Sequence, residues 1–247
     1  ADTTVFSGGQ LLYQITANGS SSDELGIRNQ GSGAGLIGLS GSNVTYGGTV
    51  IGSYSGSAGA GSFGNGSTLL TVDFNSNASV AAVQALVRNV TFRGTSDNPS
   101  TATRTISLTV SDGTGMTSTP AVVTMAVTAV NDAPVITSNG GGASASVSVA
   151  ETRTAVTTVT STDADGGTAV YSIAGGADAA KFTLDASTGA LAFITAPDYE
   201  APTDSGADNV YNVTVQVSDG AGGSDTQAIA VTVTDVAATL VVDTASD

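Results

Sequence analysis

The 247 residues include 21 acidic and 6 basic side chains, which give a formal net charge of -15, and this charge disfavours nucleic acids and anionic membranes because both are bound through Lys and Arg contacts with phosphate. The absence of cysteine and histidine excludes disulfides, thiolate metal sites and the usual general base of enzymes. Carboxylates that lie close together repel one another and need a cation. The ten acidic residues after Lys181 are accompanied by no Lys or Arg, so such a cation would have to come from outside the chain.

The length suits two domains, and a composition rich in Gly, Ser, Thr, Ala and Val favours short β-strands over long helices. No apolar run is long enough to span a membrane. Residues 1–9 lack the basic and apolar regions of a signal peptide, so we expect a mature segment or a piece of a longer protein.

The first half begins irregularly and contains one helical pattern. A Gly/Ser-rich stretch over residues 31–67 still holds spaced apolar residues, so we expect short strands joined by loose loops rather than a disordered linker. In NASVAAVQALVRNV (residues 77–90), Asn77 or Ser79 can cap a helix, and Val80, Val83 and Val87 lie on one face. We predict one short helix packed on a β-sandwich.

Each half ends in a similar pair of strands. TISLTVSDGTG (105–115) is similar to NVTVQVSDGAG (212–222), and a second alternating run follows each. Between the halves, NDAP (131–134) places a proline that has no N–H to give to a sheet. We therefore predict an all-β chain of two tandem β-sandwich domains, 1–130 and 135–236, joined by a linker at 131–134, with 237–247 starting a further linker or repeat.

The second half contains the clearest hairpin. In KFTLDASTGALAF (181–193), Phe182 and Leu184 precede a loop with Gly189, and Leu191 and Phe193 follow it. The four apolar side chains can share one face because alternate residues of a strand point the same way. Strand signals at intervals of about ten residues, separated by glycine-containing turns, suit a sandwich of short strands.

Acidic residues occur in patterns that have two explanations each. Asp163 and Asp165 stand two apart before a glycine, which suits a turn and a calcium loop equally well. No EF-hand is predicted, because its twelfth position falls on Ala174. Glu151 lies in an apolar strand that begins at Val147, where a charge can simply protect an exposed edge.

The remaining acidic patterns are weaker when taken singly. Asp198 and Glu200 share one side of an extended segment, or belong to a solvated loop. Asp112 and Asp219 each precede a glycine and suit hairpin turns.

The order of these patterns resembles a cadherin-type repeat over about residues 135–236. In that family the motifs occur in the order x-E-x, D-x-D, a core of Y-S-I and F-x-I-D-x-x-T-G-x-L, D-R-E, and D-x-G. This chain has matching residues in the same order: Glu151, Asp163-x-Asp165, YSIAGGADAAKFTLDASTGALAF, Asp198-x-Glu200 and Asp219. The first half resembles the divergent cadherin-like repeats of large bacterial surface proteins. It keeps the closing strands and the linker, while Asn18 or Asp23 occupies the region of the Asp163 pair.

This resemblance implies a Greek-key sandwich of cadherin/Ig type and calcium bound where repeats meet. One set of ligands would lie near the linker and a second set at the far end of the second domain. The first set comprises Asp97, Asn131, Asp132, Asp163, Asp165 and Asp219, and the second comprises Glu151, Asp198, Glu200 and Asp235.

Two departures from the family pattern reduce the ligand count. Ala129 stands where the first linker would carry its leading acid, and Asp235 is followed by VAAT instead of the rest of the motif. Because calcium takes about six to eight oxygens, waters and carbonyls must complete each set. We expect one or two ions per junction.

The implied function is that of a calcium-rigidified, extracellular repeat segment of a bacterial adhesin, acting in adhesion, spacing and biofilm at the cell surface. Its partners would be calcium ions, neighbouring repeats of the same chain, and glycans or proteins of a cell surface. The alternative is a polysaccharide-binding module, for which exposed tyrosines would have to replace the missing tryptophan. The candidate tyrosines are Tyr46, Tyr54, Tyr171, Tyr199 and Tyr211.

An enzyme is disfavoured, because a sandwich of short strands is not expected to form a cleft between a pair of catalytic carboxylates.

Overall fold

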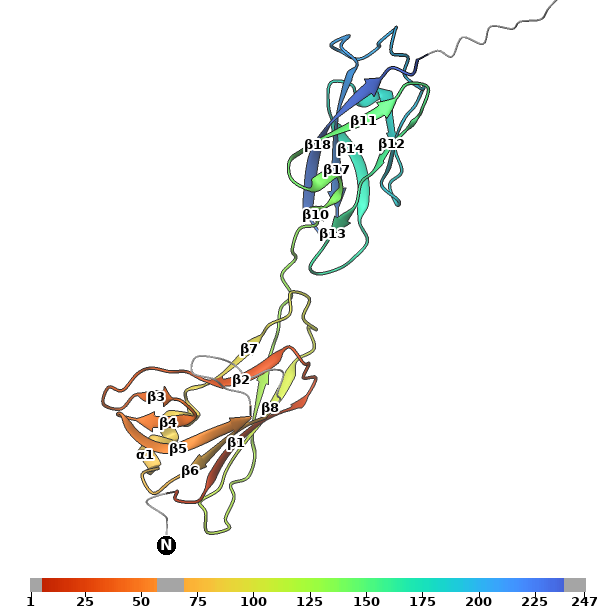
Figure 1. Cartoon of the computed structure of the whole chain (residues 1–247). Coiled ribbons are helices and arrows are strands. Elements are labelled where there is room, and N and C mark those ends of the chain that lie inside the picture. Colours follow the sequence, from red (N-terminus) through yellow and green to blue (C-terminus); the bar gives the residue numbers. More distant parts are fainter. Residues whose placement is uncertain (1–5, 57–68, 238–247) are drawn as a thin grey trace, which may run out of the picture. The chain divides into compact units, whose positions relative to one another are not determined.

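The computed structural model describes residues 6–56 and 69–237, and the chain divides into two compact units, Ala1–Ala129 and Val130–Asp247 (Figure 1). Both units are built mainly of β-strands, with one α-helix among the described residues, so the predicted all-β fold class is confirmed. Of the stretch 237–247, which we expected to start a further linker or repeat, all but the first residue lies outside the described residues.

The first unit is organised around one antiparallel sheet with the strand order β3-β4-β5-β6-β1-β8-β9. Strands β3 to β5 lie in the described part of the Gly/Ser-rich stretch, so short strands form there as predicted. The ribbon of β2 and β7 is separate from this sheet. The bounds are β1 Gln10–Ala17, β2 Asp23–Ile27, β3 Ile37–Ser40, β4 Asn43–Tyr46, β5 Thr49–Gly56, β6 Leu69–Phe74, β7 Val90–Gly94, β8 Arg104–Val110 and β9 Ala121–Met125.

Helix α1 (Val80–Val87) is capped by Ser79, whose side-chain oxygen accepts a hydrogen bond from the N–H of Ala82. The predicted helix is present, but the face that carries Val80, Val83 and Val87 is not, as a whole, the face that meets the core. Ala82, Val83 and Leu86 are buried, whereas Val80 is 41% exposed. The apolar residues surround most of this short helix, so the sequence pattern alone did not specify which of them face the core.

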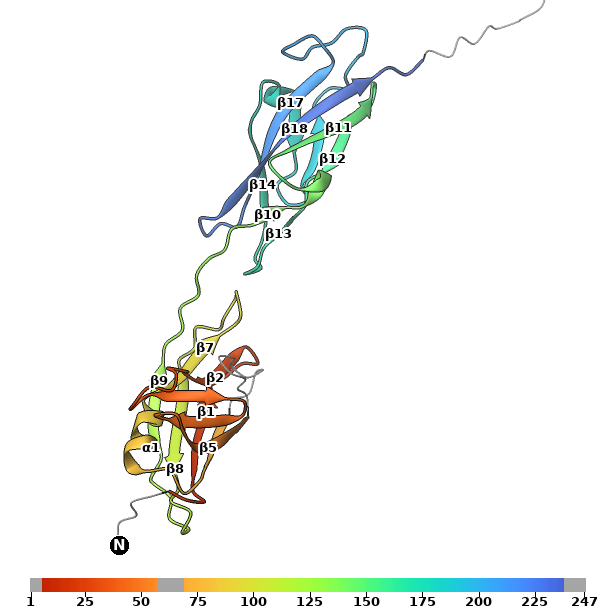
Figure 2. The same ribbon diagram turned by 60° about the vertical axis from the view of Figure 1, so that its left-hand side comes forward.

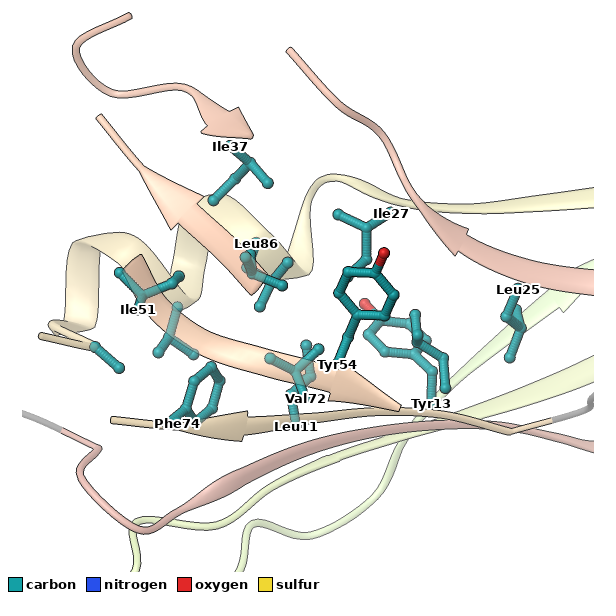
Figure 3. Packing of buried hydrophobic residues seen from close by; sticks show 14 of the residues in the cluster. Leu11, Tyr13, Leu25, Ile27, Ile37, Ile51, Tyr54, Val72, Phe74 and Leu86 are labelled. Atoms are coloured by element: carbon teal, nitrogen blue, oxygen red, sulfur yellow. The ribbon is translucent and has the colours of Figure 1, made fainter. Parts of the chain in front are cut away.

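The core of the first unit lies between the inner face of the large sheet, strand β2 and helix α1 (Figure 3). Strand β1 shows why: Leu11, Tyr13 and Ile15 alternate with exposed or half-buried residues, so one face of the strand is apolar. The hydroxyl of Tyr13 donates to the carbonyl of Val87 at 3.0 Å, which satisfies its polar end. Helix and sheet are therefore joined by packing and by a hydrogen bond.

A buried ion pair links strand β8 to strand β2. The Nε of Arg104 lies 3.0 Å from the Oδ2 of Asp23, a second bond joins its guanidinium to Oδ1 at 3.2 Å, and both side chains are buried. Burial alone would raise the pKa of Asp23, but the hydrogen bonds and charge of Arg104 hold it below its ordinary value. Asp23 is therefore a structural residue. Asn18, the other residue in this region, donates to the carbonyl of Thr103.

The second unit is a sandwich of two main sheets. One sheet has the order β11-β18-β17-β14, with β11 parallel to β18, and the other has the order β12-β16-β15 (Figures 1 and 2). A short ribbon of β10 and β13 lies beside them. The bounds are β10 Val135–Ile136, β11 Ser144–Ala150, β12 Ala155–Thr158, β13 Ser161–Thr162, β14 Val170–Gly175, β15 Phe182–Leu184, β16 Ala190–Phe193, β17 Val210–Ser218 and β18 Ser224–Thr234, with 3₁₀ turns η1 Ser138–Gly140 and η2 Ala179–Lys181.

The predicted hairpins are confirmed by strand pairing. β8 pairs with β9 and β17 with β18, both antiparallel, at the end of each unit. In the β15–β16 hairpin Phe182 lies opposite Phe193, and their rings stack with centroids 4.6 Å apart. Tyr211 of β17 meets the ring of Phe193 edge-on at 5.1 Å. This aromatic cluster joins the two sheets.

The turn of that hairpin depends on Gly189. Its φ is +71°, and a Cβ at this position would lie 2.1 Å from the carbonyl oxygen of Val159. Gly189→Ala is expected to destabilise the second unit by about 2–3 kcal/mol, because strain and a backbone clash add. Gly166 has a similar φ of +75° but no atom within 4 Å, so Gly166→Ala should cost only about 1 kcal/mol. Urea denaturation in chelator measures both, and equal costs would contradict the clash.

Candidate metal centre

Glu151 links three segments at one end of the second unit. It follows strand β11, an edge strand of its sheet, and is only 8% exposed, so the alternative of a charge that simply faces solvent at an exposed edge does not fit. Its Oε2 accepts a hydrogen bond from the N–H of Tyr199 at 3.0 Å, and its Oε1 accepts one from the N–H of Val236 at 2.9 Å. Glu151 thus holds the loop around residue 199 and the segment after β18 at the same place.

Because Tyr199 and Val236 are sequence neighbours of Glu200 and Asp235, this arrangement gathers three carboxylates. Oxygens of Glu151, Glu200 and Asp235 lie within 4.8 Å of one another, the one such group of three acidic side chains in residues 6–56 and 69–237. We call these three residues the carboxylate cluster. Glu200 and Asp235 are exposed, so the cluster is open to solvent on one side.

The charges in the cluster oppose one another. The N–H of Tyr199, followed by that of Val236, lowers the pKa of Glu151, which therefore stays ionised. The backbone amide of Glu200 favours its charged form, but desolvation and the neighbouring carboxylates raise the pKa of Glu200 above its ordinary value of 4.5. A divalent cation fits this donor set, since hard cations such as calcium prefer carboxylate oxygens.

Asp198 lies beside the carboxylate cluster without belonging to it. The N–H of Glu200 donates to the Oδ1 of Asp198 at 3.1 Å, and both side chains are exposed. This bend replaces the extended segment that we expected, so the two carboxylates do not simply share a strand face. The negative charge of Asp198 nevertheless contributes to the raised pKa of Glu200.

At the other end of the second unit, the linker is bound to the loop after β17. The Nδ2 of Asn131 donates to the Oδ2 of Asp219 at 2.7 Å. The Oδ1 of Asp219 accepts from the N–H groups of Ala221 and Gly223 at 2.7 and 3.0 Å. The bond from Asn131 and then that from Ala221 lower the pKa of Asp219. Asp219 thus combines the predicted turn with a contact to the linker.

Asp163 and Asp165 lie close to the same linker. The N–H of Asp132 donates to the Oδ2 of Asp165, and the N–H of Asp165 donates to the Oδ1 of Asp163 at 2.9 Å. Asp163 and Asp219 line one small pocket of about 120 Å³. The N–H of Gly166 donates to the carbonyl of Asp163 at 3.2 Å, so the predicted turn at residues 163–166 is present. The five predicted ligands of this end, from Asn131 to Asp219, lie around the beginning of the second unit, and their role as metal ligands stays a prediction.

Sequence reasoning missed Asp225 in this region. Its Oδ2 accepts the N–H of Ile136 at 2.8 Å, which fixes the chain just after the linker. Asp225 stands next to the first residue of β18, with no motif to separate it from an ordinary exposed acid. Only a structure could reveal this contact, because the two residues are 89 positions apart.

The acidic residues of the first unit lie in different surroundings. Asp97 is exposed in the segment between β7 and β8, and its predicted role as a metal ligand stays a prediction. Asp112 forms a turn in which its Oδ1 accepts from the N–H of Thr114 at 2.8 Å. That bond and the Thr114 hydroxyl lower the pKa of Asp112.

The tyrosines do not form the exposed platform that the polysaccharide alternative requires. Tyr54, Tyr171 and Tyr211 are buried, and Tyr46 is half-buried. Of the five, Tyr199 is the exposed one, at 38%. The simple explanation of these residues as sandwich tyrosines is confirmed for the three that are buried.

No helix within the described ranges is long and apolar enough to cross a membrane. Residues 145–234 match the family model described as the cadherin domain, so the resemblance drawn from the motifs of the second half is confirmed. No curated protein matches the chain.

The chain is also similar, at low sequence identity, to several solved structures. A crystal structure of human CDH23 EC21-23 is 17% identical, with a TM-score of 0.44, and the match covers 92% of this chain and 59% of that one. Protocadherin Gamma B2 extracellular cadherin domains 3-6 are 18% identical, with a TM-score of 0.42, covering 74% and 38%. Mouse clustered PcdhgC3 EC1-3 is 16% identical, with a TM-score of 0.40, covering 88% and 56%. The chain thus spans less than two thirds of each of these structures.

Proposed function

Residues 145–234 match the cadherin-domain family, and from this premise we propose that the chain is a calcium-binding, calcium-rigidified extracellular repeat segment of a bacterial adhesin. Its role is adhesion and spacing, without catalysis. The observation that supports the calcium claim is the approach of three carboxylates, Glu151, Glu200 and Asp235, to within 4.8 Å. Two unit charges about 4 Å apart repel by roughly 4 kcal/mol at an effective dielectric near 20, so such a group favours a bound cation.

In residues 6–56 and 69–237, no Lys or Arg forms an ion pair with this cluster. The two ion pairs among the described residues, Arg93–Glu24 and Arg104–Asp23, both lie in the first unit. Calcium, when bound, supplies the positive charge that offsets the repulsion in the carboxylate cluster. Glu151 prepares the site, because its hydrogen bonds to backbone N–H groups already hold the neighbours of Glu200 and Asp235. We propose that Asp198 adds negative charge nearby.

At the beginning of the second unit we propose a second set of calcium ligands. The linker residues Asn131 and Asp132 already bond to Asp219 and Asp165, so an ion held there would fix the linker more firmly. Asp163 completes this set, and Asp97 is the ligand that we propose from the first unit. Neighbouring repeats of the same chain, and glycans or proteins at a cell surface, are the proposed partners.

Replacing Glu200 by glutamine tests the calcium proposal. We expect Glu200→Gln to weaken calcium binding about tenfold or more, because the site loses one full charge while side-chain size is kept. Isothermal titration with calcium chloride at pH 7 measures the affinity. Asp208→Asn is the matched control, since Asp208 is an exposed acid whose Oδ1 accepts a backbone N–H from Val210 and lies outside the cluster. Equal affinities for the wild-type chain and Glu200→Gln would contradict the proposal.

The same variant should change the pH dependence of stability in chelator. Because the folded-state pKa of Glu200 is raised above 4.5, its protonation favours the folded state, and this contribution is lost as pH rises through the raised pKa. Glu200→Gln removes that loss, so above pH 4.5 the variant should be at least as stable as the wild-type chain. Urea denaturation between pH 4 and pH 7 checks this sign. A variant that becomes less stable than the wild-type chain as pH rises would oppose it.

A further inference from the structure

The loop that carries Glu200 is fixed by two hydrogen bonds to the backbone of Tyr199, one to its N–H and one to its carbonyl. The N–H of Tyr199 donates to Glu151, a member of the carboxylate cluster, at 3.0 Å. Its carbonyl accepts a hydrogen bond from the Nδ2 of Asn209, also at 3.0 Å. The position of the next residue, Glu200, therefore depends on two side chains, one inside the cluster and one outside it.

Asn209 is itself held firmly. Its N–H donates to the Oδ1 of Asp204 at 3.1 Å, and its carbonyl accepts the N–H of Val233 at 2.9 Å. Asp204 is buried, and although burial alone would raise its pKa, hydrogen bonds from the N–H groups of Asp208 and Asn209 keep the pKa of Asp204 low. The carboxylate of Asp204 and strand β18 thus hold the backbone of Asn209 in place.

The conformation of Asn209 carries a cost. Its φ is +64°, and its buried Oδ1 has no hydrogen-bond partner among the described residues. A left-handed residue and an unsatisfied buried oxygen each reduce stability, so the surrounding structure must maintain them. The side-chain bond that this conformation provides is the one to the carbonyl of Tyr199.

We propose that Asn209 is a positioning residue for the carboxylate cluster. By holding Tyr199, it sets the place of Glu200 relative to Glu151 and Asp235, and so it raises the affinity of the cluster for calcium. This inference rests on the proposed function. It adds a residue that offers the ion no ligand and that acts through the backbone of the ligand loop.

Two substitutions of Asn209 and one control test this role. Asn209→Gly keeps the positive φ and removes the amide, and Asn209→Asp keeps the shape and the left-handed tolerance but loses the N–H donor. We expect each to weaken calcium binding by about two- to tenfold, at the same site that Glu200→Gln weakens. Ala207→Gly is the control, because Ala207 is exposed in the same loop with a φ of +53°. Its affinity should stay within about twofold of that of the wild-type chain.

The measurement is titration of the full chain with calcium chloride at 25 °C, together with melting in chelator. A lower melting temperature in chelator with unchanged calcium affinity would assign Asn209 a merely structural role and overturn the inference. An equal loss of affinity in Ala207→Gly would overturn it as well. If the wild-type chain binds no calcium at this site, the proposed function fails and the inference fails with it. If the wild-type chain binds calcium and both Asn209 variants bind it equally well, only the inference fails.

Discussion

Arg104→Ala is expected to destabilise the first unit by about 3–5 kcal/mol, because it leaves the buried carboxylate of Asp23 without its partner. Arg104 is fully buried, makes two bonds to Asp23, and also donates to the carbonyls of Ser100 and Ala102. The substitution therefore leaves the buried carboxylate of Asp23 without its counter-charge. Hydrogen exchange read by mass spectrometry gives the opening free energy of first-unit peptides separately from those of the second unit.

The neighbouring ion pair supplies the control for this experiment. Arg93 lies 2.5 Å from Glu24, but its side chain is 47% exposed. The Glu24 side chain is 11% exposed, so water reaches this pair from the Arg93 side only. Arg93→Ala should therefore lower first-unit protection by about 1–2 kcal/mol, less than Arg104→Ala. A loss in Arg104→Ala as small as that in Arg93→Ala would show that burial of the Asp23 pair has no special importance.

Calcium at a thousand times its dissociation constant is expected to stabilise the second unit by about 4 kcal/mol over the same chain in chelator. The reason is linkage: an ion that binds only the folded arrangement of Glu151, Glu200 and Asp235 shifts the unfolding equilibrium toward the folded state. Hydrogen exchange of peptides within 135–236 measures the shift, and urea denaturation gives the overall free energy.

Two controls separate site binding from general screening of an acidic chain. Sodium chloride at matched ionic strength should protect the second unit far less than calcium, because screening acts on all exposed charges. In Glu200→Gln the calcium effect should fall in step with the affinity. Equal protection by sodium chloride would indicate that the net charge of -15, and no specific site, is responsible.

Local patterns allowed much of the second unit to be predicted. The β15–β16 hairpin follows from alternate apolar residues around Gly189, since both partners of each strand pair lie within twelve positions. The gathering of Glu151, Glu200 and Asp235 at one end was implied by the family resemblance, and the structure brings these three together. The order of these acidic residues along the chain was visible in the sequence alone.

The contacts that position the acidic side chains could not be predicted in this way. Glu151 bonds to N–H groups 48 and 85 residues away, and Asp23 meets a guanidinium 81 residues away. Such pairs depend on how distant strands and loops come together in the folded domain, and the local periodicity of hydrophobic residues does not contain this information. The same limit explains Val80: a short helix with apolar residues on most sides does not reveal from its sequence which side meets the sheet.

A crystal structure of the full chain grown in calcium tests the central claim most directly. We predict anomalous density for one calcium ion bound by oxygens of Glu151, Glu200 and Asp235, at the 2.3–2.6 Å usual for this metal. Density for water alone among these three carboxylates, in crystals that hold calcium at saturating concentration, would contradict the claim.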